Sequence, residues 1–186
     1  KYGNRLEKRV DKKELPAGIT AKAVLDNYIK AIGGEKAVTS VKTISMIGST
    51  TIPQAPSPLT FTNKADSRGK LMIELAMGPM SLMKQVVNEK GAYVVQQGQT
   101  KKIEGTDLAE MQASATTFEE LQLSKKSGLV VSGIESINGN DAYAILNGKS
   151  TLYYDIKSGL KVSEAKTMEQ GGKKMTQITN YGDYRE

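Results

Sequence analysis

The side chains that most often carry enzymatic chemistry are missing from this sequence. Its 186 residues include no histidine and no cysteine. Nucleophilic triads built on histidine, and zinc sites with a pair of histidines on one helix, are therefore impossible. Carboxylates alone suit zinc poorly, because that metal prefers nitrogen and sulfur ligands. We therefore expect no catalytic residue, no metal site and no cofactor in this chain.

Carboxylate chemistry is the hydrolytic reaction that the composition leaves open. A glycoside hydrolase needs two carboxylates, and Glu119-Glu120 or Glu164 could supply them. Adjacent glutamates on a helix point in different directions, however, so we interpret this pair as solvated surface. An enzyme in its own right is accordingly the least favoured of the functions considered below.

Methionine is the side chain in excess, and four of the eight methionines lie within twelve residues. In the same segment one strand face is wholly apolar, with Leu71, Ile73, Leu75 and Met77 at alternating positions. Methionine fills irregular apolar space and suits surfaces that accommodate variable ligands. These side chains are either ordinary core residues or the lining of an apolar cavity between a sheet and its helices. The candidate lining consists of Met72, Met77, Met80, Met83, Met111 and Phe118.

The elements that would position these side chains are mostly short strands joined by tight turns. Asn147-Gly148 predicts a type I′ hairpin, because both central residues of that turn need a positive φ. Strands joined by such tight links run antiparallel. The string Gly148-Lys149-Ser150 is similar to the end of a phosphate-binding loop, but no helix follows it, so we interpret it as part of the hairpin.

Two helical intervals are expected. The first begins at the N-cap residue Thr20 and stops at Gly33-Gly34, with one more helical turn at 35–40. The second covers 107–123 and contains two capping boxes, so it is either one helix or two short ones. The apolar stripes are Leu25, Tyr28, Ile29 and Ile32 on the first, and Leu108, Met111, Ala115 and Phe118 on the second.

The number of strands sets the fold class. An open, twisted sheet of about ten strands tends to curl. We therefore predict a mainly β (α+β) fold: a curled antiparallel half-barrel of about ten strands, with helices covering its concave face. The expected strands are 42–52, 59–65, 70–77, 80–88, 92–97, 99–104, 130–137, 142–146, 149–156, 160–169 and 173–181.

A length of 186 residues suits one domain, and a composition of 38% hydrophobic and 25% charged residues is ordinary for a folded protein. The net charge is +6, and half of this excess lies in residues 1–14. We predict a linker or tail at 1–18 and a single domain at 19–186. Basic and aromatic residues do not coincide, which argues against nucleic-acid binding.

The most apolar stretch, 71–83, is interrupted by Glu74 and by Gly78-Pro79, so we expect no transmembrane segment. No export signal is visible. Because the chain begins with Lys1, we interpret it as an excised or processed piece of a longer protein.

The order of the elements and several short strings carry a resemblance to a known family. A helix with a Gly-Gly stop precedes a long run of antiparallel strands, which one short helical segment interrupts. The strings are Ile19-Thr20-Ala21, Tyr28-Ile29-Lys30-Ala31-Ile32-Gly33-Gly34, Val41-Lys42-Thr43-Ile44, Tyr153-Tyr154-Asp155, Gly159-Leu160 and Tyr181-Gly182-Asp183-Tyr184. The element order resembles the lipoprotein carriers of the bacterial envelope, the LolA/LolB-like fold. The strings resemble the domain C-terminal to insulinase-type zinc peptidase domains in envelope proteins of some Gram-negative bacteria, a group described as zinc proteases.

The resemblance implies binding by an apolar lining and a periplasmic or cell-envelope location in a Gram-negative bacterium. The H-x-x-E-H metal motif of the peptidase is absent, so no hydrolytic role passes to any residue here. The leading hypothesis is a non-catalytic domain, peripheral to the membrane, that binds a lipid-like or acyl ligand, or a lipidated protein. It would be an accessory domain of a zinc peptidase. The alternative is a structural or interaction domain that positions a neighbouring peptidase and has no ligand of its own.

Overall fold

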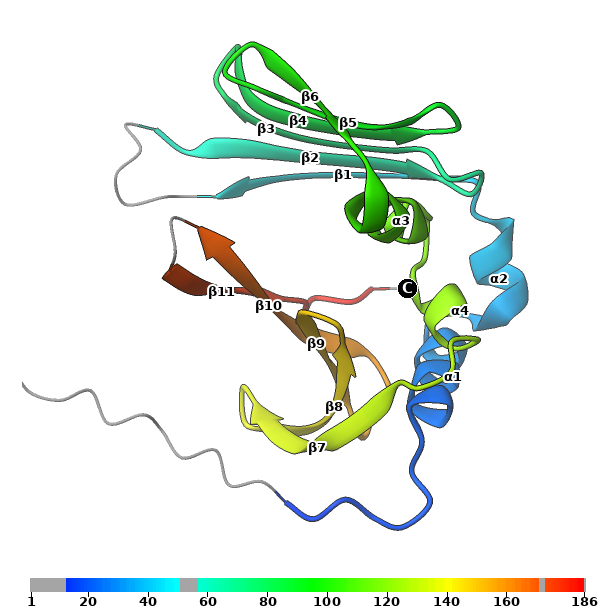
Figure 1. Ribbon diagram of the computed structural model, residues 1–186. Coiled ribbons are helices and arrows are strands. Elements are labelled where there is room, and N and C mark those ends of the chain that lie inside the picture. Colours follow the sequence, from blue (N-terminus) through cyan, green and yellow to red (C-terminus); the bar gives the residue numbers. More distant parts are fainter. Residues whose placement is uncertain (1–12, 51–56, 171–172, 186) are drawn as a thin grey trace, which may run out of the picture. The chain divides into compact units, whose positions relative to one another are not determined.

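The computed structural model describes residues 13–50, 57–170 and 173–185. Within them the chain forms eleven strands and four helices. The chain divides into two compact units: unit 1 contains the described residues up to Glu35 and from Glu120 onward, and unit 2 is Lys36–Glu119. Figure 1 shows the elements of both units. The short helix α2 (Gly34–Ser40) spans the boundary between them.

Unit 1 combines a five-stranded antiparallel sheet with helices α1 and α4. The strand order is β11-β10-β9-β8-β7, so each strand pairs with its neighbours in the sequence. The predicted closing series of strands is confirmed. The bounds are α1 (Ala21–Ala31), α4 (Glu120–Leu123), β7 (Val130–Ile137), β8 (Asn140–Asn147), β9 (Ser150–Asp155), β10 (Lys161–Gln170) and β11 (Lys173–Asn180).

Helix α1 starts as the sequence predicts and supplies four of the nine buried residues in the described core of unit 1. The backbone N–H of Ala23 donates a hydrogen bond to Thr20 Oγ1 at 3.2 Å, which caps the first turn. Leu25 and Tyr28 are buried, and the Tyr28 ring lies 5.4 Å from that of Tyr154. This apolar stripe packs on a row of cross-strand neighbours: Val131, Ile145 and Leu152.

Two hairpins of unit 1 use different turns. Asn138-Gly139 forms the first, and both residues have positive φ (+50° and +87°), the type I′ pattern. The prediction of a type I′ turn at Asn147-Gly148 is wrong. Asn147 pairs with Ser150, so the loop is Gly148-Lys149, and only Gly148 has a positive φ (+59°), as in a type II′ turn. A hydrogen bond that Lys126 Nζ donates to Asn147 Oδ1 at 3.2 Å helps to keep Asn147 in β8.

A buried ionic cluster joins α4, β10 and the C-terminal residues of unit 1. Lys161 Nζ lies 3.3 Å from Glu120 Oε1 and 3.1 Å from Glu164 Oε2. The Tyr154 hydroxyl donates to Glu120 Oε1 at 3.4 Å, and the Tyr184 hydroxyl donates to the Lys161 carbonyl at 2.7 Å. Lys161 is 7% exposed and Glu120 is 6% exposed. We call these five residues the Lys161 cluster.

The interpretation of Glu119-Glu120 as solvated surface is therefore wrong. Glu120 is buried and Glu119 is half-buried. The physical reason is a lysine far away in the sequence, whose ammonium offsets the burial of the Glu120 carboxylate. Sequence spacing within the helix carries no information about such a partner.

The charges of the Lys161 cluster favour a structural role. Burial alone would lower the pKa of Lys161, but the carboxylates of Glu120 and Glu164 outweigh it and hold that pKa above its ordinary value. Burial raises the pKa of the Tyr28 and Tyr184 hydroxyls. Lys161 therefore stays charged and these tyrosines stay neutral. The two carboxylates share the Lys161 ammonium, and these contacts connect α4, β10 and the C-terminal residues.

Unit 2 is a six-stranded antiparallel meander with a helix on one face. The strand order follows the sequence from β1 to β6. The interval predicted at 107–123 holds two short helices, α3 and α4, which was one of the two alternatives. Residues 51–52, at the end of a predicted strand, lie outside the described residues. The bounds are β1 (Thr43–Thr50), β2 (Leu59–Asp66), β3 (Leu71–Met77), β4 (Met80–Asn88), β5 (Gly91–Gln96), β6 (Gln99–Ile103) and α3 (Gly105–Ser114).

One end of this sheet forms the core of unit 2. Six cross-strand neighbours, one from each strand, pack with Leu108, Met111 and Ala115. Figure 1 shows α3 lying against this face of the sheet, which we call the α3 face. We call the six neighbours the first row: Ile44, Ala65, Leu71, Val87, Ala92 and Ile103.

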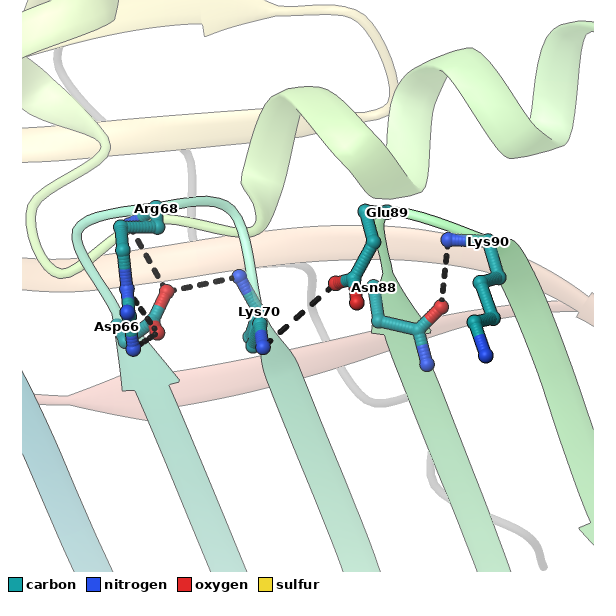
Figure 2. Close-up of polar contacts among 6 residues, drawn as sticks. All are labelled: Asp66, Arg68, Lys70, Asn88, Glu89 and Lys90. Atoms are coloured by element: carbon teal, nitrogen blue, oxygen red, sulfur yellow. Dashed lines mark hydrogen bonds and ion pairs between the residues drawn. The ribbon is translucent and has the colours of Figure 1, made fainter.

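Side chains fix the two turns at this end of the sheet. Figure 2 shows the Asp66 carboxylate accepting hydrogen bonds from the backbone N–H groups of Arg68 (2.8 Å) and Lys70 (3.1 Å). Burial by itself would raise the pKa of Asp66, but these bonds hold it below its ordinary value. Asn88 Oδ1 accepts from the N–H of Lys90 at 2.8 Å in the next turn. Both turns therefore help to set the register that lines up the first row.

The described part of the predicted linker, from Lys13 on, belongs to unit 1. Lys13 forms an ion pair of 2.7 Å with Asp141, and Leu15 packs against the core under α1. Residues 1–12 of that predicted linker lie outside the described residues. The division into a linker at 1–18 and a single domain at 19–186 stays a prediction.

The Lys161 cluster makes a stability prediction. Lys161→Met leaves Glu120 buried without its cation, so we expect a loss of about 3–5 kcal/mol in the free energy of unfolding. Lys161→Met/Glu120→Leu should recover most of that loss, because the fully buried carboxylate is then removed as well and only the more exposed Glu164 lacks its cation. Urea titration followed by circular dichroism measures both. If Lys161→Met were as stable as the parent, the Lys161 cluster would make no contribution to the stability of the fold.

Candidate functional site

The α3 face is larger than the helix packed on it. Helix α3 has ten residues, which makes it about 15 Å long and about 10 Å wide. Six strands spaced about 4.8 Å apart span about 24 Å, and side chains on one face recur roughly every 7 Å along a strand. The core under α3 is built on the first row, and Ile73 of the next row also packs against it; the other side chains farther along the strands do not belong to that cluster.

Two more rows follow the first on the same face. Strand alternation and register place them, since every second residue points to the same side. The third row is apolar at its centre and has glycine or polar residues at its outer positions, whereas apolar and polar side chains alternate along the second row. The second row is Met46, Asn63, Ile73, Gln85, Val94 and Lys101, and the third is Gly48, Phe61, Leu75, Met83, Gln96 and Gln99.

The centre of the third row forms an apolar surface on β2, β3 and β4, and Ile73 of the second row extends it toward the first row. Its members are half-buried except for Met80, which is 51% exposed at the β3–β4 hairpin. Met77 and Met80 are paired across that hairpin and extend the surface past the third row. We call this surface the apolar patch: Phe61, Ile73, Leu75, Met77, Met80 and Met83.

The structure brings together three of the six residues predicted as ligand lining. Met77, Met80 and Met83 belong to the apolar patch. Met72 alternates with Leu71 in β3, so its side chain lies on the opposite face of the same strand.

The other two predicted residues lie outside the patch. Met111 packs with the first row as part of the unit 2 core. Phe118 is half-buried in the segment between α3 and α4 and belongs to neither helix. That all six line one ligand site stays a prediction.

Sequence reasoning missed Phe61, which pairs with Leu75 and is one of two phenylalanines in the chain. The available signal was the alternation of Leu59, Phe61 and Ala65 within a predicted strand. Asn63 interrupts that alternation, which is why the strand does not look apolar on one side.

A groove of about 590 Å³ on unit 2 is a second candidate. It lies at the end of β1–β4 near the turns of Figure 2. By strand alternation, Met72 and Val86 present apolar side chains on the opposite face, together with charged neighbours such as Lys64. Farther along that face, Glu74 and Lys84 form an ion pair of 3.0 Å. The opposite face is therefore more polar than the apolar patch.

The α3 face also has a hollow, of about 400 Å³, over β5 and β6. It continues the second and third rows toward the sheet edge, where the side chains become polar. A ligand on this face would therefore meet an apolar centre and a polar margin. The hollow is lined by Val94, Gln96, Gln97, Gln99, Lys101 and Ile103.

Comparison with known proteins places the fold. No protein-family model matches the chain, and no curated protein matches its sequence. The crystal structure of a LolA superfamily protein, NE2245 from Nitrosomonas europaea, is similar with a TM-score of 0.52 and 10% identity, over 90% of this chain and 80% of that one. The Mycobacterium tuberculosis lipoprotein LppX aligns with a TM-score of 0.37 and 12% identity, over 87% of this chain and 95% of that one. The likeness to the first structure confirms the predicted fold class, mainly β and open, of the LolA kind.

Two further observations bear on the site. Among the described residues, no three acidic side chains are grouped so that they could hold a metal ion. None of the helices in the described part of the chain combines the length and apolar character needed to cross a membrane. What the α3 face offers chemically is an apolar surface with a polar margin.

The difference between the first row and the apolar patch can be tested on one strand. Leu71 is 6% exposed beneath α3, whereas Leu75 lies on the same face beyond it and is half-buried. Leu71→Ala should cost about 2–5 kcal/mol, through lost burial plus a void. Leu75→Ala should cost about 1 kcal/mol or less, because little packs on it. Urea unfolding compares the two; equal costs would mean that the patch is a close-packed core.

Proposed function

We propose that this chain is a non-catalytic binding domain that holds an acyl chain, from a lipid or a lipidated protein, on the apolar patch of unit 2. The observation that carries the proposal is the patch itself, six apolar side chains on one sheet face, five of which lie outside the core cluster under α3. Each square ångström of apolar surface removed from water is worth about 25 cal/mol. Contiguous apolar surface of this kind marks sites of ligand or protein contact.

The side-chain types of the patch support an acyl ligand of variable shape. Three of the six are methionines, whose unbranched side chains adapt to irregular partners. Phe61 and Leu75 are cross-strand neighbours and supply a broad apolar base. The polar positions at the outer ends of the rows would meet the polar end of an amphiphile.

We further propose a periplasmic or cell-envelope location in a Gram-negative bacterium, peripheral to the membrane, beside a zinc peptidase domain. The LolA-like fold supports the envelope location. Strings such as 153–155 and 181–184 support the peptidase link, because they resemble the domain that follows such peptidases. In that setting this chain supplies binding and its neighbour supplies the chemistry.

The binding proposal predicts saturable uptake of an acyl probe that carries an environment-sensitive fluorophore. Leu75→Gln places an amide in the patch and should weaken binding at least about 10-fold. Val86→Gln is the matched control, because Val86 lies on the opposite face and should leave the affinity within about twofold. Fluorescence titration measures all three proteins, with circular dichroism as the check of folding.

Two outcomes would overturn this proposal. Absence of saturable binding in the parent would favour the alternative of a support domain without a ligand. Equal losses in Leu75→Gln and Val86→Gln, or a loss only in Val86→Gln, would move any ligand away from the α3 face.

A further inference from the structure

One polar side chain on the α3 face, that of Asn63, has a buried oxygen without a hydrogen-bond donor among the described residues. Asn63 occupies the second row, between Met46 of β1 and Ile73 of β3, its direct cross-strand neighbours. Its side-chain oxygen Oδ1 is fully buried and accepts no hydrogen bond from any described residue. Asparagine is also disfavoured in strands. An amide held here needs a physical reason.

A buried carbonyl oxygen without a donor destabilises the folded protein, by about 1–3 kcal/mol in typical cases. Two other polar side chains of this sheet have partners: Asn88 accepts from a backbone N–H, and Glu74 pairs with Lys84. Among the described buried side-chain oxygens and nitrogens, Asn63 Oδ1 is the unpaired one. Such an acceptor is satisfied when a donor is brought to it.

The following inference rests on the proposed acyl site. We infer that Asn63 recognises the polar head group of the ligand by accepting a hydrogen bond from an N–H or O–H group next to the acyl chain. The position fits this role, because Asn63 adjoins Ile73 of the apolar patch. A carbonyl oxygen can accept but cannot donate. The ligand class is therefore a neutral amphiphile with a donor, such as an N-acyl amide or a fatty alcohol. Esters and ionised fatty acids lack that donor.

The inference predicts a preference that depends on one side chain. Oleamide, oleyl alcohol, methyl oleate and oleate compete at pH 8 with the acyl probe for the parent protein. Oleamide and oleyl alcohol should displace the probe at concentrations about 10-fold lower than methyl oleate does, the factor that one neutral hydrogen bond supplies. In Asn63→Leu this ratio should fall to about one, because the acceptor is gone while the apolar contacts remain.

Matched variants keep the test decisive. Gln85→Leu removes an amide from the same row, on the far side of Ile73, and should leave the preference unchanged. Asn63→Leu should have a urea midpoint equal to or above that of the parent, because an unpaired buried oxygen has been removed. Asn63→Val serves as the second variant if leucine is too large for the site.

Each outcome has one meaning. Loss of the preference in the Asn63 variants, but not in Gln85→Leu, supports the inference. A preference that survives in the Asn63 variants, or its absence from a parent that binds methyl oleate, overturns it. Tightest binding by oleate would also overturn it, since a cationic side chain would then recognise the carboxylate head group. If neither the probe nor any competitor binds the parent, the proposed acyl site itself has failed.

Discussion

The α3 face of the six-stranded sheet is wider and longer than one ten-residue helix can cover. This mismatch is the constraint on which the rest of the functional account depends. In a sheet with one face buried, apolar and polar residues normally alternate along each strand, so that one face packs on the core and the other meets water. Here apolar side chains continue past the first row, at Ile73 of β3 and then across the third row on β2, β3 and β4. Apolar area left in that state is stabilised by contact with another apolar body.

Unit 1 is held together by a covered apolar core and a buried ionic cluster. Its α1 stripe covers the Val131, Ile145 and Leu152 row, and the Lys161 cluster fastens α4 and Tyr184 to β10. Charges buried in this way contribute little net stability, yet they specify which segments meet. The cluster brings Glu120 and Glu164 to one ammonium, which uses both carboxylates for structure. Carboxylate chemistry therefore has no free pair in this part of unit 1.

Much of the fold follows from local sequence signals. Alternation and turn residues predict the strands, because the loops hold residues such as Asn138-Gly139 whose φ is positive. The exact turn at Gly148-Lys149 does not follow, since pairing of Asn147 with Ser150 depends on sheet register. The burial of Glu120 does not follow either, because its partner Lys161 lies 41 positions further along the chain. Local periodicity is blind to both.

The candidate site was predictable to the extent that it lies on one strand. Alternation in β3 marks Leu75 and Met77 as one face, whereas clustering by residue type grouped Met72 with them although it points the other way. Phe61 and Asn63 join the site only through the pairing of β2 with β3. That register is a property of the folded sheet. Only this register shows which of the clustered methionines lie on the same face as Phe61 and Leu75.

The most direct test of the central claim uses those methionines as reporters. Methyl-13C-methionine NMR of the parent with a spin-labelled fatty-chain amide measures which methyl signals the bound label broadens. The account predicts broadening of Met77, Met80 and Met83, with Met72 unaffected, because the same strand presents them on opposite faces. Broadening of Met72 without Met83 would place the ligand in the groove on the opposite face and contradict the account.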